Sequence, residues 1–155
     1  MVSIVYLDAS ALVKQYIAES GSAWVRSLLV SARTPTAFIS CLTVVEASCA
    51  FARRRREGTL SAENHAGVLT AFGYDIAYRY NILDVTPAVI NRARRLADQH
   101  PLRAYDAVQL ATALLAGWQL IQTGQPPLIF ICADDRLTAI AQSEDLLTDN
   151  PNHHP

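Results

Sequence analysis

In the stretch IVYLDASALVK, residues 4–14, an apolar run is followed by a single acid and then by a second apolar segment. Val2 to Leu7 has the composition of a buried strand, and Asp8 follows it directly. Asp is a favoured residue at helix N-caps, so capping of a following helix is one interpretation of Asp8. The other is a functional site, because parallel α/β folds build sites at the carboxyl ends of their strands. Further acids at the same edge would favour the site.

The rest of the chain repeats this alternation of a short apolar strand with a helix. Because parallel strands joined by helices are covered on both faces, the alternation predicts a parallel sheet between two layers of helices. The length of 155 residues is that of one domain, which we expect to span 1–150 and to leave a frayed polar tail at 151–155. The later strands are expected at 37–39, 82–85, 128–132 and 146–148, and the helices at 10–17, 22–31, 42–56, 61–80, 88–100, 105–118 and 134–142.

Composition narrows the class of protein. Apolar residues make up 51% of the chain, enough for a large core, and a formal net charge of -1 gives no overall basic field for nucleic acid. The three cysteines, Cys41, Cys49 and Cys132, lack CxxC spacing, which argues against a disulfide framework and a zinc site. The first apolar run is too short for a signal peptide or a membrane span, so we expect a cytoplasmic protein with no membrane partner.

Four acids stand in apolar or small-residue surroundings: Asp8, Glu46, Asp106 and Asp134. Three of them follow a strand or begin a helix, positions that meet at one edge of a parallel sheet. The helix dipole also favours an acid in a first turn, so a purely structural role for Asp106 and Asp134 stays open. Glu46 differs because it lies within an apolar helix, where a carboxylate has to be paired, protonated or bound to a metal.

An acid cluster of this kind predicts a hard divalent cation. Neighbouring carboxylates repel one another unless a cation neutralises them, and all-oxygen ligands suit Mg²⁺ or Mn²⁺ rather than zinc. Such ions activate water and stabilise charge on a phosphoryl group. The sequence contains neither a P-loop nor a GxGxxG motif, and no Ser-His-Asp context for another nucleophile.

Four segments carry a resemblance to a known family: YLDASALVKQY (6–16), LTVVEASCAFARR (42–54), LRAYDAVQLATAL (102–114) and FICADDRLTAIA (130–141). They resemble the four acidic motifs of PIN-domain ribonucleases, and most of all those of VapC-type toxins from toxin–antitoxin pairs. The motifs stand in the family's order and cover nearly the whole chain, from about Ile4 to Pro151.

The resemblance implies a three-layer α/β/α sandwich around a parallel sheet of four or five strands. It implies an Mg²⁺- or Mn²⁺-dependent endoribonuclease that cleaves single-stranded regions of RNA, forms a homodimer and is blocked by a VapB-like antitoxin. Asp8, Glu46, Asp106 and Asp134 take the places of the family's four acids. Asp8 and Asp106 are then the metal ligands, with Glu46 and Asp134 contributing directly or through water.

Neighbouring positions complete the implied site. Ser10 fits a hydroxyl position that supports the metal shell in the family. The last motif usually has Thr or Ser two residues before its acid, where this chain has Cys132. A thiol is a poor substitute for a hydroxyl donor, so we expect weaker support of Asp134. Asp135, the next residue, is most simply a helix-start charge.

Cations and an aromatic residue near the acids each have two interpretations. Arg103 and Arg136 can bind RNA phosphate bidentately or form salt bridges with the acids. Tyr105 is either part of the core or a stacking platform for a base. The run Arg53 to Arg56 ends a helix, where solvated cations complement the dipole, and contact with RNA or antitoxin is its second interpretation.

Two other functions remain open from the sequence. One is an aspartyl-nucleophile phosphatase, because Asp8 follows a strand, although Ser10 replaces the second acid of the DxD pattern and Lys14 lies too close in sequence to serve. The other is a catalytically weak PIN-fold module for binding or dimerisation, which the presence of all four acids disfavours. Cleavage of single-stranded RNA with Mn²⁺, and its loss with EDTA, would distinguish the ribonuclease from these two other functions.

Overall fold

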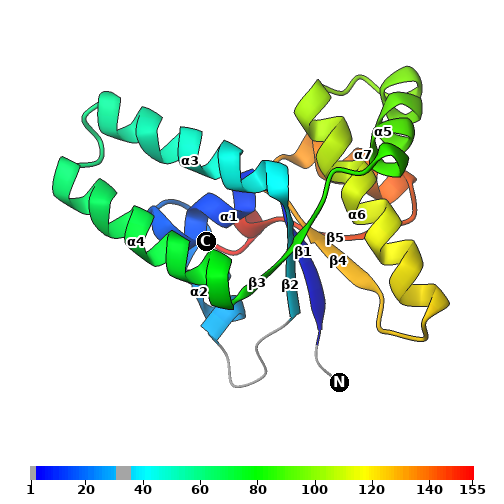
Figure 1. Cartoon of the computed structure of the whole chain (residues 1–155), viewed down its shortest axis with the longest axis horizontal. Coiled ribbons are helices and arrows are strands. Elements are labelled where there is room, and N and C mark those ends of the chain that lie inside the picture. The colour runs from blue at the N-terminus through cyan, green and yellow to red at the C-terminus, as the bar shows by residue number, and fades with distance from the viewer. Residues whose placement is uncertain (1–2, 31–35) are drawn as a thin grey trace.

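A parallel sheet of five strands forms the middle layer of the computed structural model, which describes residues 3–30 and 36–155 (Figure 1). The strand order is β3-β2-β1-β4-β5, and every neighbouring pair is parallel, as the sequence predicted. The expected strand start at Val2 and helix end at Ser31 lie outside the described residues. The strands are β1 (Ile4–Leu7), β2 (Thr36–Ser40), β3 (Tyr80–Leu83), β4 (Leu128–Ile131) and β5 (Leu147–Asp149).

Helices cover both faces of this sheet and complete the three-layer α/β/α sandwich. Helices α1 to α4 pack on one face and α5 to α7 on the other (Figure 1). A short 3-10 helix, η1 (Pro151–His153), follows the last strand. The α-helices are α1 (Ala9–Tyr16), α2 (Ser22–Val30), α3 (Cys41–Arg56), α4 (Ala62–Tyr78), α5 (Pro87–Gln99), α6 (Ala104–Gln122) and α7 (Asp135–Ser143).

The central strand β1 shows why an unbroken apolar run is needed here. Successive side chains of a strand point to opposite faces of the sheet. Val5 and Leu7 therefore pack into the core under α1 to α4, whereas Ile4 and Tyr6 pack into the core under α5 to α7. All four residues are buried, which is the expected state of a strand covered on both sides.

The strand order reverses at β1, and this reversal places the site. The chain first adds β2 and β3 on one side of β1 and later adds β4 and β5 on the other side. Ligand sites of open α/β sheets lie outside the carboxyl ends of the strands at such a reversal. Asp8, Ser40 and Cys132 are the residues that end or follow the three central strands at this edge.

Several boundaries differ from the sequence expectation, and the starts and ends of β3 and α6 show the physical reasons. Strand β3 begins at Tyr80 rather than Ile82, because Tyr80 pairs with Ala37 and its hydroxyl lies 2.7 Å from the hydroxyl of Tyr16. Helix α6 continues past Trp118 to Gln122, and Gly124, with a φ of 70°, lies just beyond its C-cap residue Thr123. Even so, none of the helices within 3–30 and 36–155 combines the length and the apolar character needed to cross a membrane.

The C-terminal tail is folded, in contrast to the fraying expected for 151–155. Pro151 and Asn150 are buried, and the His154 ring stacks on Trp24 of α2 with 4.3 Å between ring centroids. His154 Nε2 also lies 2.7 Å from Asp149 Oδ1. The prolines and polar side chains that suggested disorder instead form η1 and attach it to α2 and β5.

Candidate active site

Asp8 follows β1 directly and is the N-cap of α1. Its Oδ1 accepts hydrogen bonds from the Ala11 N–H at 3.0 Å and the Ser10 hydroxyl at 2.6 Å. The residue is only 6% exposed. Both interpretations of Asp8 therefore hold geometrically, because Oδ1 caps the helix while the carboxylate lies at the carboxyl edge of the sheet.

The Cys132 thiol lies against the second oxygen of Asp8. Sγ donates to Asp8 Oδ2 at 3.2 Å. Its contacts with Asp134 are to the backbone, whose N–H donates to Sγ at 3.4 Å and whose carbonyl accepts from Sγ at 3.8 Å. Burial, with the charge of Asp8 adding to it, raises the pKa of the Cys132 thiol and keeps it a neutral donor. The side chain in the position where Thr or Ser was expected therefore supports Asp8. Ser10 Oγ also accepts from the Ala133 N–H at 2.9 Å, which ties the segment after β4 to α1.

Glu46 is paired with a residue that the sequence interpretation did not include, Gln109 of α6. Gln109 Nε2 donates to Glu46 Oε1 at 2.7 Å and to Thr43 Oγ1 at 2.8 Å, and Gln109 Oε1 accepts from the Tyr6 hydroxyl at 2.5 Å. Because a carboxylate only accepts hydrogen bonds, this arrangement fixes which end of the amide faces Glu46. The buried network joins α3, α6 and β1.

A signal for Gln109 was present in the sequence. It lies three residues after Asp106, one turn along α6, within the apolar run AVQLATALL. Buried polar groups need hydrogen-bond partners, so an amide in such a helix predicts a network. Gln109 is 2% exposed and its partners Tyr6 and Thr43 are fully buried. No local pattern indicates which hydrogen-bond partners Gln109 meets.

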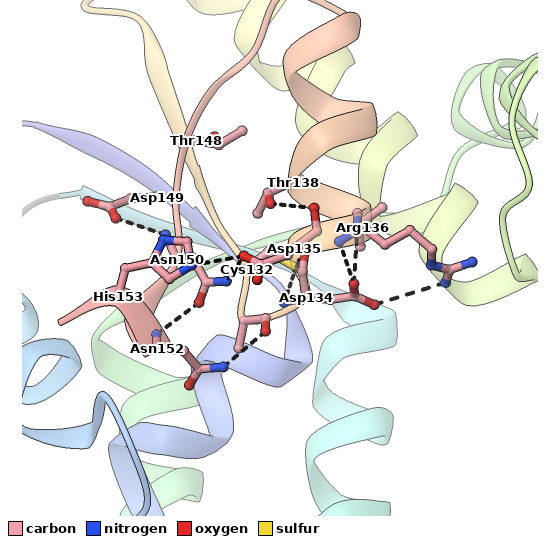
Figure 2. A network of polar contacts seen from close by, with 12 residues as sticks. Cys132, Asp134, Asp135, Arg136, Thr138, Thr148, Asp149, Asn150, Asn152 and His153 are labelled. Atoms are coloured by element: carbon pink, nitrogen blue, oxygen red, sulfur yellow. Dashed lines mark hydrogen bonds and ion pairs between the residues drawn. The ribbon is translucent and has the colours of Figure 1, made fainter. Parts of the chain in front are cut away.

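Asp106 and Asp134 share one cation, Arg136. Arg136 Nη2 lies 3.4 Å from Asp106 Oδ2. It also lies 4.0 Å from Asp134 Oδ2 (Figure 2). Asp134 is also the N-cap of α7, because its Oδ1 accepts from the backbone N–H groups of Arg136 and Leu137 at 2.9 and 3.3 Å. Of the two interpretations of Arg136, the structure contains the salt bridge. Arg103, the N-cap residue of α6, is exposed.

Asp135 belongs to a separate network, shown in Figure 2. Its Oδ1 accepts from Asn150 Nδ2 at 2.6 Å and lies 3.0 Å from His153 Nε2. The Asp135 side chain is 73% exposed. Of the two adjacent acids, Asp134 thus faces Arg136 and the acid cluster, whereas Asp135 holds the segment that contains η1.

Burial and like charge raise the pKa of three of the acids. Burial is the main cause for Asp8, and the charge of Asp106 adds to it. Burial also raises the pKa of Glu46, with further contributions from Asp8 and Asp106. The pKa of Asp106 is raised by burial and by Asp134, against the opposing effect of Arg136. The four acids therefore form one electrostatic cluster, in which Asp134 is linked through Asp106.

The cluster suits a hard divalent cation in charge and donor type. Its four acids offer only oxygen ligands, which Mg²⁺ and Mn²⁺ prefer. Arg136 already places one positive charge between two of them. Across 3–30 and 36–155, however, no three His, Cys, Asp or Glu side chains converge closely enough to form a finished metal site.

A groove of about 570 Å³ lies beside the acids. Ser10 and Glu46 line it, as do α3 residues as far as Arg56 and Tyr105 from the start of α6. Tyr105 is 60% exposed, so the expectation that it packs in the core is wrong. An exposed aromatic ring next to Asp106 is available to a ligand in the groove.

Comparison with known proteins agrees with this geometry. Residues 5–125 match the family model for the PIN domain, and no curated protein matches the sequence. A chain of FitAcB from Neisseria gonorrhoeae has a TM-score of 0.64 at 19% identity, covering 97% of this chain and 99% of that one. VapBC2 from Rickettsia felis, bound to a promoter DNA fragment, has a TM-score of 0.64 at 14% identity, with coverages of 95% and 98%. Mycobacterium tuberculosis VapC20, a sarcin-ricin loop cleaving toxin, has a TM-score of 0.61 at 15% identity, with coverages of 87% and 93%.

These solved structures share the fold over most of their length and of this chain. The family match adds sequence evidence, because it includes three of the four acids, Asp8, Glu46 and Asp106. It spans well over half of the chain, from β1 to the loop that follows α6. On this evidence the chain belongs to the PIN domain family.

Proposed function

We propose that this PIN domain, residues 1–150, is a metal-dependent endoribonuclease that hydrolyses phosphodiester bonds in single-stranded regions of RNA. The observation that carries the proposal is the placement of Asp8, Asp106 and Asp134 after strands or at a helix start on the carboxyl edge of the sheet, with Arg136 between the last two and Glu46 held by Gln109. Carboxylates gathered at the carboxyl edge of a parallel sheet suit metal-assisted phosphoryl chemistry. The resemblance to VapC-type toxins, and the similar fold of a sarcin-ricin loop cleaving toxin, support RNA as the substrate.

In this proposal Asp8 and Asp106 hold the ion, with Glu46 and Asp134 contributing directly or through water. When bound, Mg²⁺ or Mn²⁺ supplies positive charge for the phosphoryl transition state and activates a water molecule. The acids carry the negative charge that retains the ion. The pKa values of Asp8, Glu46 and Asp106 are raised mainly by burial and further by neighbouring acids, so a bound cation would favour their ionised forms.

Neutral neighbours orient these acids. Ser10 and Cys132 donate to different oxygens of Asp8, which restrains the carboxylate in one orientation. Gln109 restrains Glu46 in the same way. Such preorganisation matters because a ligand displaced by even a fraction of an ångström holds the ion and the attacking water in the wrong place.

Arg136 and Arg103 are the proposed contacts to RNA phosphate. In the structure Arg136 neutralises Asp106 and Asp134 in part. The planar fork of the Arg136 guanidinium suits phosphate oxygens, and Arg136 would be free to bind them if a bound cation neutralised the two acids in its place. Arg103 lies one turn before Asp106 and is exposed toward solvent, where it can reach the same strand.

We further propose that the protein is the toxin of a toxin–antitoxin pair, acts in the cytoplasm as a homodimer and is held inactive by a VapB-like antitoxin. Structures of FitAcB and VapBC2 share its fold, and the toxin resemblance of the four motifs points the same way. Sedimentation of the purified chain tests the dimer. Co-purification with the product of the neighbouring reading frame tests the antitoxin.

Cleavage of a labelled single-stranded RNA tests the proposed activity. Wild-type protein should cut the strand with MnCl₂ and stop with EDTA, and Asp106→Asn should cut at least 100-fold more slowly with an unchanged circular dichroism spectrum. Binding without cleavage would instead support the module that only binds. Hydrolysis of a phosphomonoester without RNA cleavage would support the phosphatase.

The adjacent acids Asp134 and Asp135 provide a matched pair for the same assay. We expect Asp134→Asn to lower turnover at least tenfold, because this carboxylate faces Arg136 and lies close enough to Asp106 to raise its pKa. Asp135→Asn should retain activity, because its side chain contacts Asn150 and His153. The reverse result would mean that the fourth acid of the site is Asp135.

A further inference from the structure

The groove beside the acids continues along one face of α3 to its basic end. Glu46, Cys49, Arg53 and Arg56 all line it. They follow one another at spacings of three or four residues, so they form a stripe along the helix. With a rise of about 1.5 Å per residue, Arg53 lies roughly 10 Å along the axis from Glu46 and Arg56 roughly 15 Å. The stripe therefore leads from the acid cluster to two guanidinium groups.

The charge of the groove is positive away from the acids. Its acid Glu19 is already paired with two cations, Lys14 at 3.0 Å and Arg54 at 2.6 Å. Arg53 and Arg56 are exposed, and in the part of the chain that the structure describes neither takes part in an ion pair. Because the whole chain has a net charge of -1, this basic surface is local rather than a general property.

The groove also offers room and an aromatic ring. Between Glu46 and Arg53 the stripe consists of small side chains, Cys49 and Ala50. Tyr105 lines the same groove and is 60% exposed. Sites that bind single-stranded nucleic acid combine a basic groove along the backbone with an aromatic ring on which a base stacks.

We propose that this groove binds the single-stranded RNA on one side of the cleaved bond, with Arg53 and Arg56 on its phosphates and Tyr105 against a base. The inference rests on the proposed function and deepens it by assigning a path to the substrate. Arginine suits this role because its planar fork pairs with phosphate oxygens bidentately. Arg54 is not assigned to an RNA phosphate, because it forms an ion pair with Glu19.

Arg55 provides the matched control, since it lies in the same helical turn, is exposed and does not line the groove. The measurement is binding of a fluorescent single-stranded RNA in EDTA, by anisotropy, over a series of KCl concentrations. Each phosphate contact on a single strand contributes about 0.7 to the slope of log Kd against log salt. We expect Arg53→Gln to lower the slope by about 0.7, and Arg53→Gln combined with Arg56→Gln by about 1.4. The double variant should bind at least tenfold more weakly near physiological salt, and Arg55→Gln less than twofold.

Tyr105→Leu tests the stacking contact separately. It keeps an apolar surface but removes the ring, so binding should weaken at least fivefold with an unchanged salt slope. Equal losses for Arg53→Gln and Arg55→Gln would overturn the assigned path. So would a double variant that cuts RNA with the wild-type KM, because the groove would then lie off the substrate path while the proposed nuclease would stand. If the wild type neither binds nor cuts RNA, the proposed function itself fails.

Discussion

At the scale of single residues, Asp8 both caps a helix and belongs to the acid cluster. Its Oδ1 caps α1, and its Oδ2 accepts from the Cys132 thiol. Burial opposes the charge of this carboxylate, which is why its pKa is raised. The ionised form therefore weakens the fold, and a bound cation or a neutral replacement should relieve that cost.

The variant Asp8→Asn tests this cost through pH. Asn is as good an N-cap as Asp, so α1 should survive the change. Folding raises the pKa of Asp8, so the protonated carboxyl favours the folded state. This contribution to stability is complete below the unfolded pKa of 3.8 and is lost as the pH rises through the folded pKa. In EDTA, the free energy of unfolding of Asp8→Asn relative to wild type should therefore increase with pH above about 4 and then level off. Urea unfolding at a series of pH values measures it, and a pH-independent difference would contradict the prediction.

The variant Gln109→Leu tests the buried network. It leaves Glu46, Tyr6 and Thr43 without their shared partner. Because an unsatisfied buried polar group costs about 1–3 kcal/mol, we expect the free energy of unfolding to fall by about 2 kcal/mol. Thr138→Val is the control, since the Thr138 hydroxyl is also buried but donates within its own helix α7, to the Asp135 carbonyl. Equal losses in the two variants would mean that the network adds nothing.

At the scale of elements, the docking of η1 depends on the turn before α2. Gly21 has a φ of +81°, and a Cβ built there would lie 2.3 Å from the Pro151 carbonyl oxygen. Only glycine fits both the left-handed backbone and the close approach. The tail is thus held through the backbone as well as through the stack of His154 on Trp24.

Two glycine substitutions should have opposite effects on stability. Gly21→Ala should lower the free energy of unfolding by about 2 kcal/mol or more, because the left-handed conformation alone costs about 1–2 kcal/mol and η1 must also move. Gly67→Ala lies within α4, where a Cβ meets nothing within 4 Å, and should raise it by about 1 kcal/mol. Denaturant unfolding of both variants measures the effects. Tolerance of Gly21→Ala would mean that the tail is not tightly docked.

At the scale of the whole molecule, the sheet topology brings distant acids together. Asp8 and Asp134 follow strands β1 and β4, which are adjacent in the sheet although far apart in the chain. Asp106 and Glu46 come from helices on opposite faces, α6 and α3. The negative charge they concentrate should make stability depend on divalent ions.

Metal addition should therefore raise the melting temperature. A ligand that binds only the folded state stabilises it by about 2.7 kcal/mol at 100 times its Kd. Thermal unfolding with and without millimolar MnCl₂ measures the shift. The double variant Asp8→Asn, Asp106→Asn should show a much smaller shift, because two of the four acids are then neutral. An equal shift in this variant would place the metal elsewhere.

The order and type of the elements followed from local patterns. The apolar run of β1, the Thr86-Pro87 start of α5 and the helical spacing within α3 are each readable over a few residues, and each element formed. The boundaries of the elements were harder to predict from the sequence. Strand β3, for example, begins at Tyr80 because Tyr80 pairs with Ala37 of β2 and its hydroxyl contacts that of Tyr16 in α1. The packing of the C-terminal tail could not be predicted either, because it too depends on contacts with other elements.

The sequence alone determined that three of the four acids stand at strand ends or helix starts, that Glu46 lies within a helix, and that the sheet is parallel. Those features arise from residue type and spacing along a single segment. Tertiary structure alone decided that Gln109 holds Glu46, that the thiol of Cys132 faces Asp8 and that Arg136 bridges two acids. Each of these contacts joins groups on different elements, and hydrogen-bond and ion-pair geometry depends on how those elements pack, which no local pattern encodes.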